Sequence, residues 1–420
     1  MKARLSPSQL NGEITPPPSK SCFHRALICA AASDKPTKIL AASFSKDIEA
    51  TISCLESLGA RFEYGDGFVT VFPIEESDKE CVLDCNESGS TLRFMLPFAA
   101  TLGRKCTFVG AERLGKRPLL PLCKVLSKNG VSVNYGESFL PCTIEGKLAG
   151  GTYEIEGNIS SQFITGLLLA LGVAGGGEIR ATTPIESASY IDITTKIQEE
   201  FGVIAQKKDN SFIISAGQKY TSPNEFCVEG DYSNAAFFLV AGALSSENGI
   251  TMDALPEKTC QGDSKIVEIL LKMGAKIVRD NDKVTVYKSK LHAVDVDCSD
   301  IPDIVPILCV AASGADGVST FCNINRLRMK ESDRVESTAE MIRNLGGKID
   351  FDENNIYVTG TSLKGGVVNS ANDHRIAMSG AVASLISKGD VVIEDAMAVE
   401  KSYPDFYEKF KALGGIVNEL

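Results

Sequence analysis

The chain carries one sequence pattern six times over. In each copy a helical stretch ends in glycine and an alternating strand follows, as in "CLESLGARFEY" and "LLKMGAKIVRD". The marker glycines are separated by 71, 72, 72, 72 and 68 residues, and they are Gly59, Gly130, Gly202, Gly274, Gly346 and Gly414. Glycine directly after a helix commonly takes a positive φ that turns the chain. The repeat therefore predicts six similar structural units.

A second marker follows the same period. Polar residues precede helical stretches rich in alanine, glycine and leucine, as in "SSQFITGLLLALG" and "NDHRIAMSGAVASL". The reference residues are separated by 69, 71, 72, 70 and 70 positions, and they are Ser21, Ser90, Ser161, Ser233, Asp303 and Asp373. Each unit is predicted to contain a strand, a capped internal helix, a second strand, an outer amphipathic helix and a hairpin. Such units should group with their internal helices inward.

Six units in one chain predict two domains of three units each. The 420 residues are too many for one ordinary hydrophobic core, and the expected fold class is α/β (α+β). Turn-forming residues gather in "NGEITPPPSK" and "AGQKYTSPNEFCVEGD". We expect a first domain at residues 13–228 and a second domain made of residues 1–12 and 229–420. Two chain crossings of this kind suit a hinge.

Charge, cysteine usage and hydropathy limit the partners of the chain. The net charge of −11 argues against nucleic-acid binding, which needs a basic face. The apolar stretch "FITGLLLALGVAG" is too short to cross a membrane, and "MKARLSPSQLNG" has no apolar signal core. The 13 cysteines are odd in number, lie mostly in apolar runs and form no Cys-x-x-Cys motif. We expect a reduced, cytoplasmic, monomeric protein without a metal site.

Basic residues accompany the polar starts of the predicted internal helices. Lys20 and Arg25 lie at the first start, Asp303 at the fifth and Arg375 at the sixth, and "GKRP" occupies 115–118. Serine at such a position is often a plain helix cap. Cations, in contrast, oppose the helix dipole unless an anion binds beside them. We expect the N-termini of these helices to face an interdomain cleft that binds anionic substrates.

The stretch "RLRMKESDR" at 326–334 places four basic and two acidic residues in nine positions. Such a run is commonly a solvated helix face with ion pairs. It can also be part of a binding site, and the stretch alone leaves both interpretations open.

Nine motifs, in order and spacing, give the chain a family resemblance over essentially its whole length. They are "PPSKSCFHRA", "ESGSTLRF", "RLGKRP", "SSQF", "SASYID", "IPD", "RMKESDR", "NDHRIAM" and "KSYPDF". With them the chain resembles the 5-enolpyruvylshikimate-3-phosphate synthases. The resemblance implies the two-domain enolpyruvyl transferase fold, with three repeated units per domain. It also implies the reaction of shikimate 3-phosphate with phosphoenolpyruvate in the shikimate pathway, without a metal or organic cofactor.

The resemblance further implies roles for individual residues. The residues expected to bind shikimate 3-phosphate are Lys20, Ser21, Arg25, Ser160, Ser161, Gln162, Ser187, Tyr190, Asp303 and Lys330. Those expected to bind phosphoenolpyruvate are Lys20, Gly89, Arg117, Gln162, Arg334, Arg375 and Lys401. The expected catalytic residues are Asp303, Glu331 and Lys20. Glu331 would protonate and later deprotonate C3 of phosphoenolpyruvate, while Asp303 lies beside the reacting hydroxyl. Arg328 and Asp333 are expected to be structural partners.

Four positions depart from common family patterns, and they are Glu87, Phe94, His24 and Arg326. The presence of Gly89 predicts inhibition by glyphosate, although Glu87 and Phe94 alter the surroundings of that loop.

Two alternative functions remain to be weighed. A UDP-N-acetylglucosamine enolpyruvyl transferase would have the same fold, but it carries cysteine where this chain has Glu112. A non-catalytic anion-binding scaffold would not need Glu331 or Asp303. In such a scaffold, these two acidic residues would weaken the binding of a dianion.

Overall fold

The computed structural model describes residues 1–419, and the chain divides into two compact units. Unit 1 contains Met1–Pro17 and the chain from Glu229 onward, while unit 2 is the continuous stretch Pro18–Val228. The strand β2 (Gly12–Ile14) pairs in parallel with β15 (Ile250–Met252), a strand of unit 1. Residues 13–17 therefore lie in the same unit as residues 1–12, whereas the sequence analysis assigned them to the other domain.

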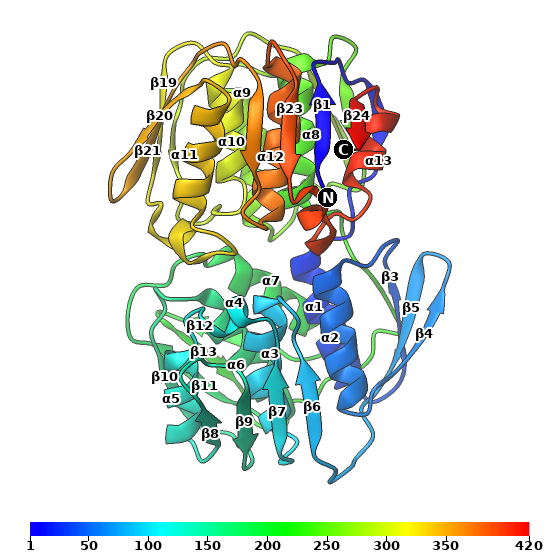
Figure 1. Ribbon diagram of the computed structural model, residues 1–420. Coiled ribbons are helices and arrows are strands. Elements are labelled where there is room, and N and C mark those ends of the chain that lie inside the picture. Colours follow the sequence, from blue (N-terminus) through cyan, green and yellow to red (C-terminus); the bar gives the residue numbers. More distant parts are fainter. Residues whose placement is uncertain (420) are drawn as a thin grey trace. The chain divides into compact units, whose positions relative to one another are not determined.

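Each unit contains three four-stranded sheets of one topology, counted over residues 1–419 (Figure 1). In unit 2 the sheet orders are β14-β3-β5-β4, β6-β7-β9-β8 and β10-β11-β13-β12. The strands are β3 (Thr37–Leu40), β4 (Arg61–Gly65), β5 (Phe68–Phe72), β6 (Cys81–Asp84), β7 (Cys106–Val109), β8 (Ser132–Tyr135), β9 (Cys142–Glu145), β10 (Thr152–Ile155), β11 (Gly177–Ala181), β12 (Ala205–Lys208), β13 (Ser211–Ile214) and β14 (Glu225–Cys227).

The sheets of unit 1 repeat this arrangement, in the orders β2-β15-β17-β16, β18-β19-β21-β20 and β22-β23-β1-β24. The first two strands of every sheet are parallel and the remaining pairs are antiparallel. The further strands are β1 (Ala3–Ser6), β16 (Lys276–Asp280), β17 (Lys283–Tyr287), β18 (Asp295–Asp297), β19 (Val318–Cys322), β20 (Lys348–Phe351), β21 (Asn355–Thr359), β22 (Gly366–Asn369), β23 (Val391–Glu394) and β24 (Ile416–Glu419).

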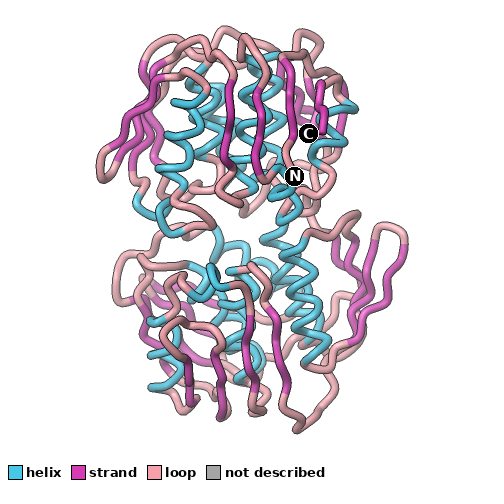
Figure 2. The backbone as a smooth tube through the Cα atoms, in the orientation of Figure 1, coloured by secondary structure: helices cyan, strands magenta, loops and turns pink. Residues whose placement is uncertain are grey.

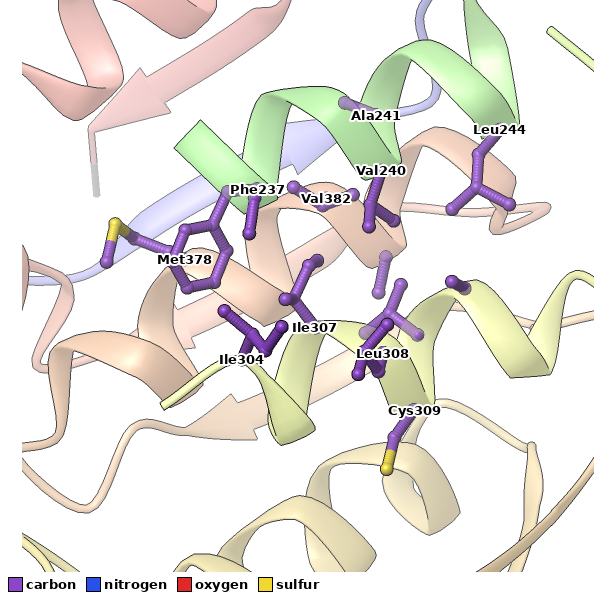
Figure 3. Packing of buried hydrophobic residues seen from close by; sticks show 14 of the residues in the cluster. Phe237, Val240, Ala241, Leu244, Ile304, Ile307, Leu308, Cys309, Met378 and Val382 are labelled. Carbon is purple, nitrogen blue, oxygen red and sulfur yellow. The ribbon is translucent and has the colours of Figure 1, made fainter. Parts of the chain in front are cut away.

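The predicted internal helices form the buried centre of each unit, with the strands around them (Figure 2). They are α1 (Lys20–Ala31), α3 (Gly89–Ala100) and α6 (Ser161–Val173) in unit 2, and α8 (Tyr232–Ser245), α10 (Val305–Ser313) and α12 (His374–Ala383) in unit 1. In unit 1, Phe237 and Val240 of α8 pack with Ile307 of α10 and Val382 of α12 (Figure 3). Beyond their polar first turns, these helices carry mostly apolar side chains on all faces because neighbouring elements cover them from every side.

The outer helices bury one face each, as their amphipathic sequences predict. They are α2 (Lys46–Ser57), α5 (Leu120–Lys128), α7 (Ser189–Glu200), α9 (Lys265–Lys272), α11 (Arg334–Asn344) and α13 (Phe406–Ala412), and the short helix α4 is Glu112–Gly115. All six marker glycines have positive φ, between 80° and 104°. This confirms the helix ends inferred from the repeat.

The predicted helix starts are confirmed for five of the six internal helices. Side chains of Ser19, Ser88, Ser160, Asp231 and Asp373 cap them by accepting backbone N–H bonds. The exception is α10, which begins at Val305 without a side-chain cap. Asp303 lies in the preceding turn and does not open the helix, so its carboxylate is available for other contacts.

Three general features narrow the kinds of site to look for. The thirteen cysteines all lie in the described residues and are free thiols. Over the same residues, no group of three or more histidine, cysteine or acidic side chains could hold a metal ion. No helix in residues 1–419 combines the length and the apolar character needed to span a bilayer.

Candidate functional site

The charged stretch at 326–334 folds into a compact turn rather than a solvated helix face. A 3₁₀ turn at Asn325–Met329 leads to Asp333, which caps α11 by accepting from the N–H groups of Val335 and Glu336. Arg328 donates to Asp333 at 3.2 Å. This pairing confirms the prediction that Arg328 and Asp333 are partners.

Arg334 lies at the centre of a cluster of acidic residues in unit 1. Its side chain is only 1% exposed. Nε donates to Oδ2 of Asp373 at 2.8 Å, and Nη1 donates to Oδ1 of Asp303 at 2.8 Å. Nη2 donates to Oε2 of Glu331 at 2.7 Å and to Oδ1 of Asp373 at 3.3 Å. All three nitrogens of the guanidinium therefore bind carboxylates, and two of the predicted catalytic acids share one cation.

The electrostatics of the cluster keep Asp303 ionised. Burial by itself would raise the pKa of Asp303, but Lys330, Arg334 and Arg375 hold it well below its usual range. Burial would lower the pKa of Arg334, and the carboxylates of Asp373 and Glu331 raise it well above its ordinary value instead. Opposite charges at this distance favour the ionised form of each partner.

The remaining predicted cations of unit 1 reach the same cluster or its edge. Lys330 donates to Asp303 at 3.0 Å, and burial lowers its pKa. Nη2 of Arg375 lies 3.6 Å from Oδ2 of Asp303, while Nη1 donates to Asn234. Lys401 donates to the carbonyl of Asn372 at 2.7 Å, in the turn before α12. The carboxylate of Asp303 thus contacts three side chains that were predicted to bind the substrates.

A second buried acid lies beside this cluster and was not singled out from the sequence. Asp263 accepts a hydrogen bond from Ser233 in the first turn of α8. Burial, together with repulsion from Asp303, raises the pKa of Asp263 to about 7.

In unit 2, Arg25 is the counterpart of Arg334, but its partners are neutral. Nε donates to the Thr194 hydroxyl at 2.8 Å, and the two terminal nitrogens donate to the carbonyls of Ser21 (2.5 Å) and Tyr190 (2.9 Å). Burial lowers the pKa of Arg25 to about 10. The guanidinium is therefore held rigidly at α7 with its charge uncompensated by the groups that it contacts.

Two of the departures from the family pattern contact each other beside Arg25. The Phe94 ring lies 4.9 Å from the Arg25 guanidinium, and the His24 ring meets Phe94 edge-on at 6.2 Å. His24 also hydrogen-bonds with Thr51 at 2.7 Å. Burial, assisted by Lys20 and Arg25, lowers the pKa of His24 well below its ordinary value, so His24 is a neutral packing partner of Phe94.

The predicted residues at the starts of α3 and α6 form a second group. Gln162 receives a hydrogen bond from Arg93 at 2.6 Å and donates to Ser90 at 2.9 Å. Arg93 also donates to the carbonyl of Pro118 at 3.2 Å, and Ser160 caps α6 by accepting from the N–H of Gln162. Arg93 therefore fixes the direction of the Gln162 amide and holds the loop that carries Arg117.

Gly89 lies directly against Arg117. A Cβ atom at position 89 would approach Nη1 of Arg117 to 2.5 Å and Nη1 of Arg93 to 3.0 Å. The absence of a side chain at Gly89 is thus what allows the Arg117 guanidinium to approach the N-terminus of α3.

The other predicted residues of unit 2 lie at helix starts. Lys20 donates to Asp47 of α2 at 2.6 Å, and Ser161 is buried in the first turn of α6. Ser187 is buried and has a φ of 53°, just before α7. Tyr190 contributes its backbone carbonyl to Arg25.

The sequence did not predict three side chains that hold the predicted site residues in place, and they are Asp47, Thr194 and Asn234. Asp263, the buried acid beside the cluster, was not predicted either. Asp373 was predicted only as a helix cap, although it also binds Arg334. None of these contacts has a sequence signature because the partners are far apart in the chain, such as the 141 positions between Asn234 and Arg375.

Comparison with known proteins gives consistent matches along the chain. The family model described as EPSP synthase (3-phosphoshikimate 1-carboxyvinyltransferase) matches residues 5–410. A 3-phosphoshikimate 1-carboxyvinyltransferase of Clostridium novyi (strain NT) is 42% identical over 429 residues, covering 99% of this chain and 98% of the relative. One of Clostridium perfringens (strain SM101 / Type A) is 40% identical and covers 100% and 99%.

Solved structures agree with these matches. The EPSP synthase of Acinetobacter baumannii superposes with a TM-score of 0.84 at 25% identity, covering 100% of both chains. The enolpyruvyl transferase NikO of Streptomyces tendae has a TM-score of 0.79 at 16% identity and covers 99% and 98%. The second likeness concerns the fold alone.

Proposed function

The chain belongs to the EPSP synthase (3-phosphoshikimate 1-carboxyvinyltransferase) family, and we propose how its side chains carry out the reaction of that family. The protein transfers the enolpyruvyl group of phosphoenolpyruvate to the 5-hydroxyl of shikimate 3-phosphate and releases phosphate. The hydroxyl oxygen adds to C2 while C3 gains a proton. C3 then loses a proton as phosphate leaves, which restores the double bond.

Unit 2 supplies most of the binding groups for shikimate 3-phosphate. Arg25, Ser160 and Ser161 bind the substrate together with Lys20, since a phosphate dianion needs cations and helix N-termini. Ser21, Gln162, Ser187 and Tyr190 contribute further polar contacts. The neutral partners of Arg25 support this assignment because they leave its charge for the substrate.

Phosphoenolpyruvate binds through cations of both units. Arg117 and Gly89 come from unit 2, while Arg334, Arg375 and Lys401 come from unit 1. Gln162 and Lys20 contact both substrates. Cations placed around the phosphate and carboxylate groups stabilise the charge that develops during addition and elimination.

Proton transfer depends on Asp303, Glu331 and Lys20. Asp303 is held ionised by its cationic neighbours, so it accepts the proton of the 5-hydroxyl, with Lys20 assisting. Glu331 gives a proton to C3 and takes one back. The observation that carries this proposal is Arg334, which holds Asp303 and Glu331 at 2.8 and 2.7 Å on one guanidinium.

Binding of phosphoenolpyruvate changes the partners of Arg334. Four of its five N–H groups donate to carboxylates. An incoming carboxylate that binds through two N–H groups must therefore replace one of these partners. Asp373 is fully buried, and Asp303 is also held by Lys330. Glu331 is 24% exposed, so it is the partner that is released. A carboxylate that loses its arginine takes up a proton more readily. Substrate binding thereby prepares Glu331 as the acid for C3.

The proposal includes a cytoplasmic enzyme that acts as a monomer. Its support is that thirteen thiols remain free and that all proposed site residues come from one chain. Sedimentation at assay concentrations tests the monomer, and a dimer mass would overturn it.

The decisive experiment measures phosphate release from phosphoenolpyruvate. Purified protein should release phosphate with shikimate 3-phosphate and not with UDP-N-acetylglucosamine. Release with the nucleotide sugar instead would establish the sister activity. No release with either acceptor, combined with tight binding of shikimate 3-phosphate, would favour the alternative function of a non-catalytic anion-binding scaffold.

A further inference from the structure

Two cysteine side chains meet at one end of a sheet in unit 2. Cys81 begins β6 and Cys106 begins β7, and the two residues are direct partners in this parallel strand pair. Their Sγ atoms are 3.2 Å apart. Cys106 is fully buried, while Cys81 is partly exposed. The proposed function uses neither residue.

The backbone places the two thiols suitably for a covalent bond. Neighbouring strands lie about 4.8 Å apart, which is within the range of about 4.4–6.8 Å between the Cα atoms of a disulfide. Cys81 and Leu83 lie on one face of β6, as Cys106 and Phe108 do on β7, because side chains alternate along a strand. Both thiols therefore project to the same face of the sheet.

The surroundings of the pair favour a thiolate on Cys81. The hydrogen bond from Cys106 lowers the pKa of Cys81 to about 7 against the opposing effect of burial, and Arg104 assists. The thiolate is the reactive form of cysteine. Cys81 thus combines access with nucleophilicity, and Cys106 lies in position to react next.

Another thiol pair of the same unit lacks access. Cys123 and Cys142 interact with each other, but both are fully buried. Cys227 is an exposed cysteine, and its Sγ donates a hydrogen bond to the backbone carbonyl of Val228. These residues provide internal controls for buried and for isolated thiols.

We propose that Cys81 and Cys106 form a reversible disulfide by exchange with low-molecular-weight disulfides. The Cys81 thiolate attacks one sulfur of the small disulfide, which forms a mixed disulfide and releases one small thiolate. The Cys106 thiol then loses its proton to solvent and attacks Sγ of Cys81, releasing the second small thiol. The protein loses two hydrogens, and the small disulfide is reduced to two thiols.

The crosslink joins the strands at the end remote from the candidate site. Gly89 and Arg117 follow the opposite ends of β6 and β7. We therefore expect unchanged turnover in the oxidised protein. A crosslink that closes a loop in the unfolded chain also stabilises the fold, so the thermal transition should rise on oxidation.

The test treats the full chain with oxidised glutathione, followed by alkylation of the remaining thiols in denaturant and peptide mapping. A Cys81–Cys106 peptide should appear with the loss of two hydrogens, while Cys123 and Cys142 are alkylated. Cys227 should become glutathionylated, which shows that the reagent is active. In Cys106→Ala, Cys81 should stop at the mixed disulfide. In Cys81→Ala, Cys106 should remain unmodified, and Cys123→Ala should behave as wild type.

The rate of alkylation in the native protein gives a second measurement. Cys81 should react with a midpoint near pH 7 in wild type and at higher pH in Cys106→Ala, which lacks the hydrogen-bond donor. If Cys227 is modified but Cys81 and Cys106 are both recovered as alkylated thiols, the proposal is wrong. A mixed disulfide on Cys81 that persists in wild type would equally overturn it.

Discussion

The two units have the same architecture, but their buried arginines differ in the charge of the groups that bind them. In unit 2, Arg25 is held by hydroxyl and carbonyl oxygens. In unit 1, Arg334 is held by the carboxylates of Asp303, Glu331 and Asp373. Neutral acceptors fix an arginine without cancelling its charge, whereas carboxylates compensate the charge and can themselves bind protons. Under the proposed function, the contacts to shikimate 3-phosphate come chiefly from unit 2, and the acids for proton transfer come from unit 1.

The largest expected effect comes from neutralising the acids of unit 1. Glu331→Gln and Asp303→Asn should each lower turnover by roughly 10²–10⁴-fold, the usual contribution of general acid–base groups. Affinity for shikimate 3-phosphate should change little because unit 2 supplies most of its contacts. Steady-state kinetics and calorimetric titration measure the two quantities. Glu340→Gln, which changes an exposed acid on α11, is the control.

The opposite outcome would reverse this assignment. Lost affinity with unchanged turnover in Glu331→Gln would make Glu331 a binding residue.

The next effect concerns the neutral oxygen atoms that hold Arg25. Arg25→Lys keeps the charge but cannot make the separate bonds to Thr194, Ser21 and Tyr190. Losing one or two such bonds should weaken binding of shikimate 3-phosphate roughly 10–100-fold. Turnover at saturation should fall less, and Arg61→Lys on the exposed surface should change neither. An equal fall in turnover with unchanged affinity would place Arg25 in the chemical step.

A smaller effect is expected from Gly89→Ala. The new methyl group meets the guanidinium of Arg117, whose displacement should raise KM for phosphoenolpyruvate roughly tenfold, the loss of about one hydrogen bond to a charged group. Glyphosate should inhibit the wild type in competition with phosphoenolpyruvate, and the variant should need more of it. Gly136→Ala is a matched control because open space surrounds that glycine. Wild-type activity that survives high glyphosate at limiting phosphoenolpyruvate would contradict this prediction.

The acids of unit 1 should also affect stability. Burial raises the pKa of Asp263 to about 7, so between about pH 4 and pH 7 the folded state holds a proton that the unfolded state has lost. This group's contribution to the free energy of unfolding is therefore full below pH 4 and falls as pH rises toward 7.

Asp263→Asn should remove this pH dependence. At pH 8 its free energy of unfolding should exceed that of wild type by on the order of 1–3 kcal/mol, and the difference should shrink toward pH 4. Urea titrations at several pH values measure it, with the exposed Asp66→Asn as control. A difference that is the same at all pH values would mean that Asp263 is not protonated in the folded state.

The smallest change is in overall dimensions. Shikimate 3-phosphate is a dianion, and by neutralising cations that repel one another it should lower the radius of gyration of the protein. Phosphoenolpyruvate alone should have little effect. Small-angle scattering is the suitable measurement because the chain has no tryptophan. An unchanged scattering curve at saturating shikimate 3-phosphate would rule out this compaction.

The sequence predicts those parts of the structure that local chemistry determines. The six marker glycines all have positive φ. The chain turns directly after a helix at each of them, and glycine adopts positive φ without strain. The cap at Asp373 follows from the same local rules. The repeat therefore predicts the six units and their helices.

Contacts between distant residues could not be predicted in this way. Asp303 was expected to open α10 but contacts Lys330 and Arg334 instead. The pairing of β2 with β15, and of Cys81 with Cys106, likewise depends on which strands become neighbours. Such choices depend on packing of whole units, which no short motif encodes.

The insertion of unit 2 into unit 1 has a consequence for synthesis on the ribosome. Unit 2 is one continuous stretch, so it can fold while the rest of the chain is still being made. The strand β1, in contrast, pairs with β23 and β24 at the other end of the sequence. At roughly 5–20 residues per second, β1 waits tens of seconds for its partners. Lys2 lies directly before this strand and Arg4 lies within it. Their charges protect the unpaired strand from aggregation during the delay.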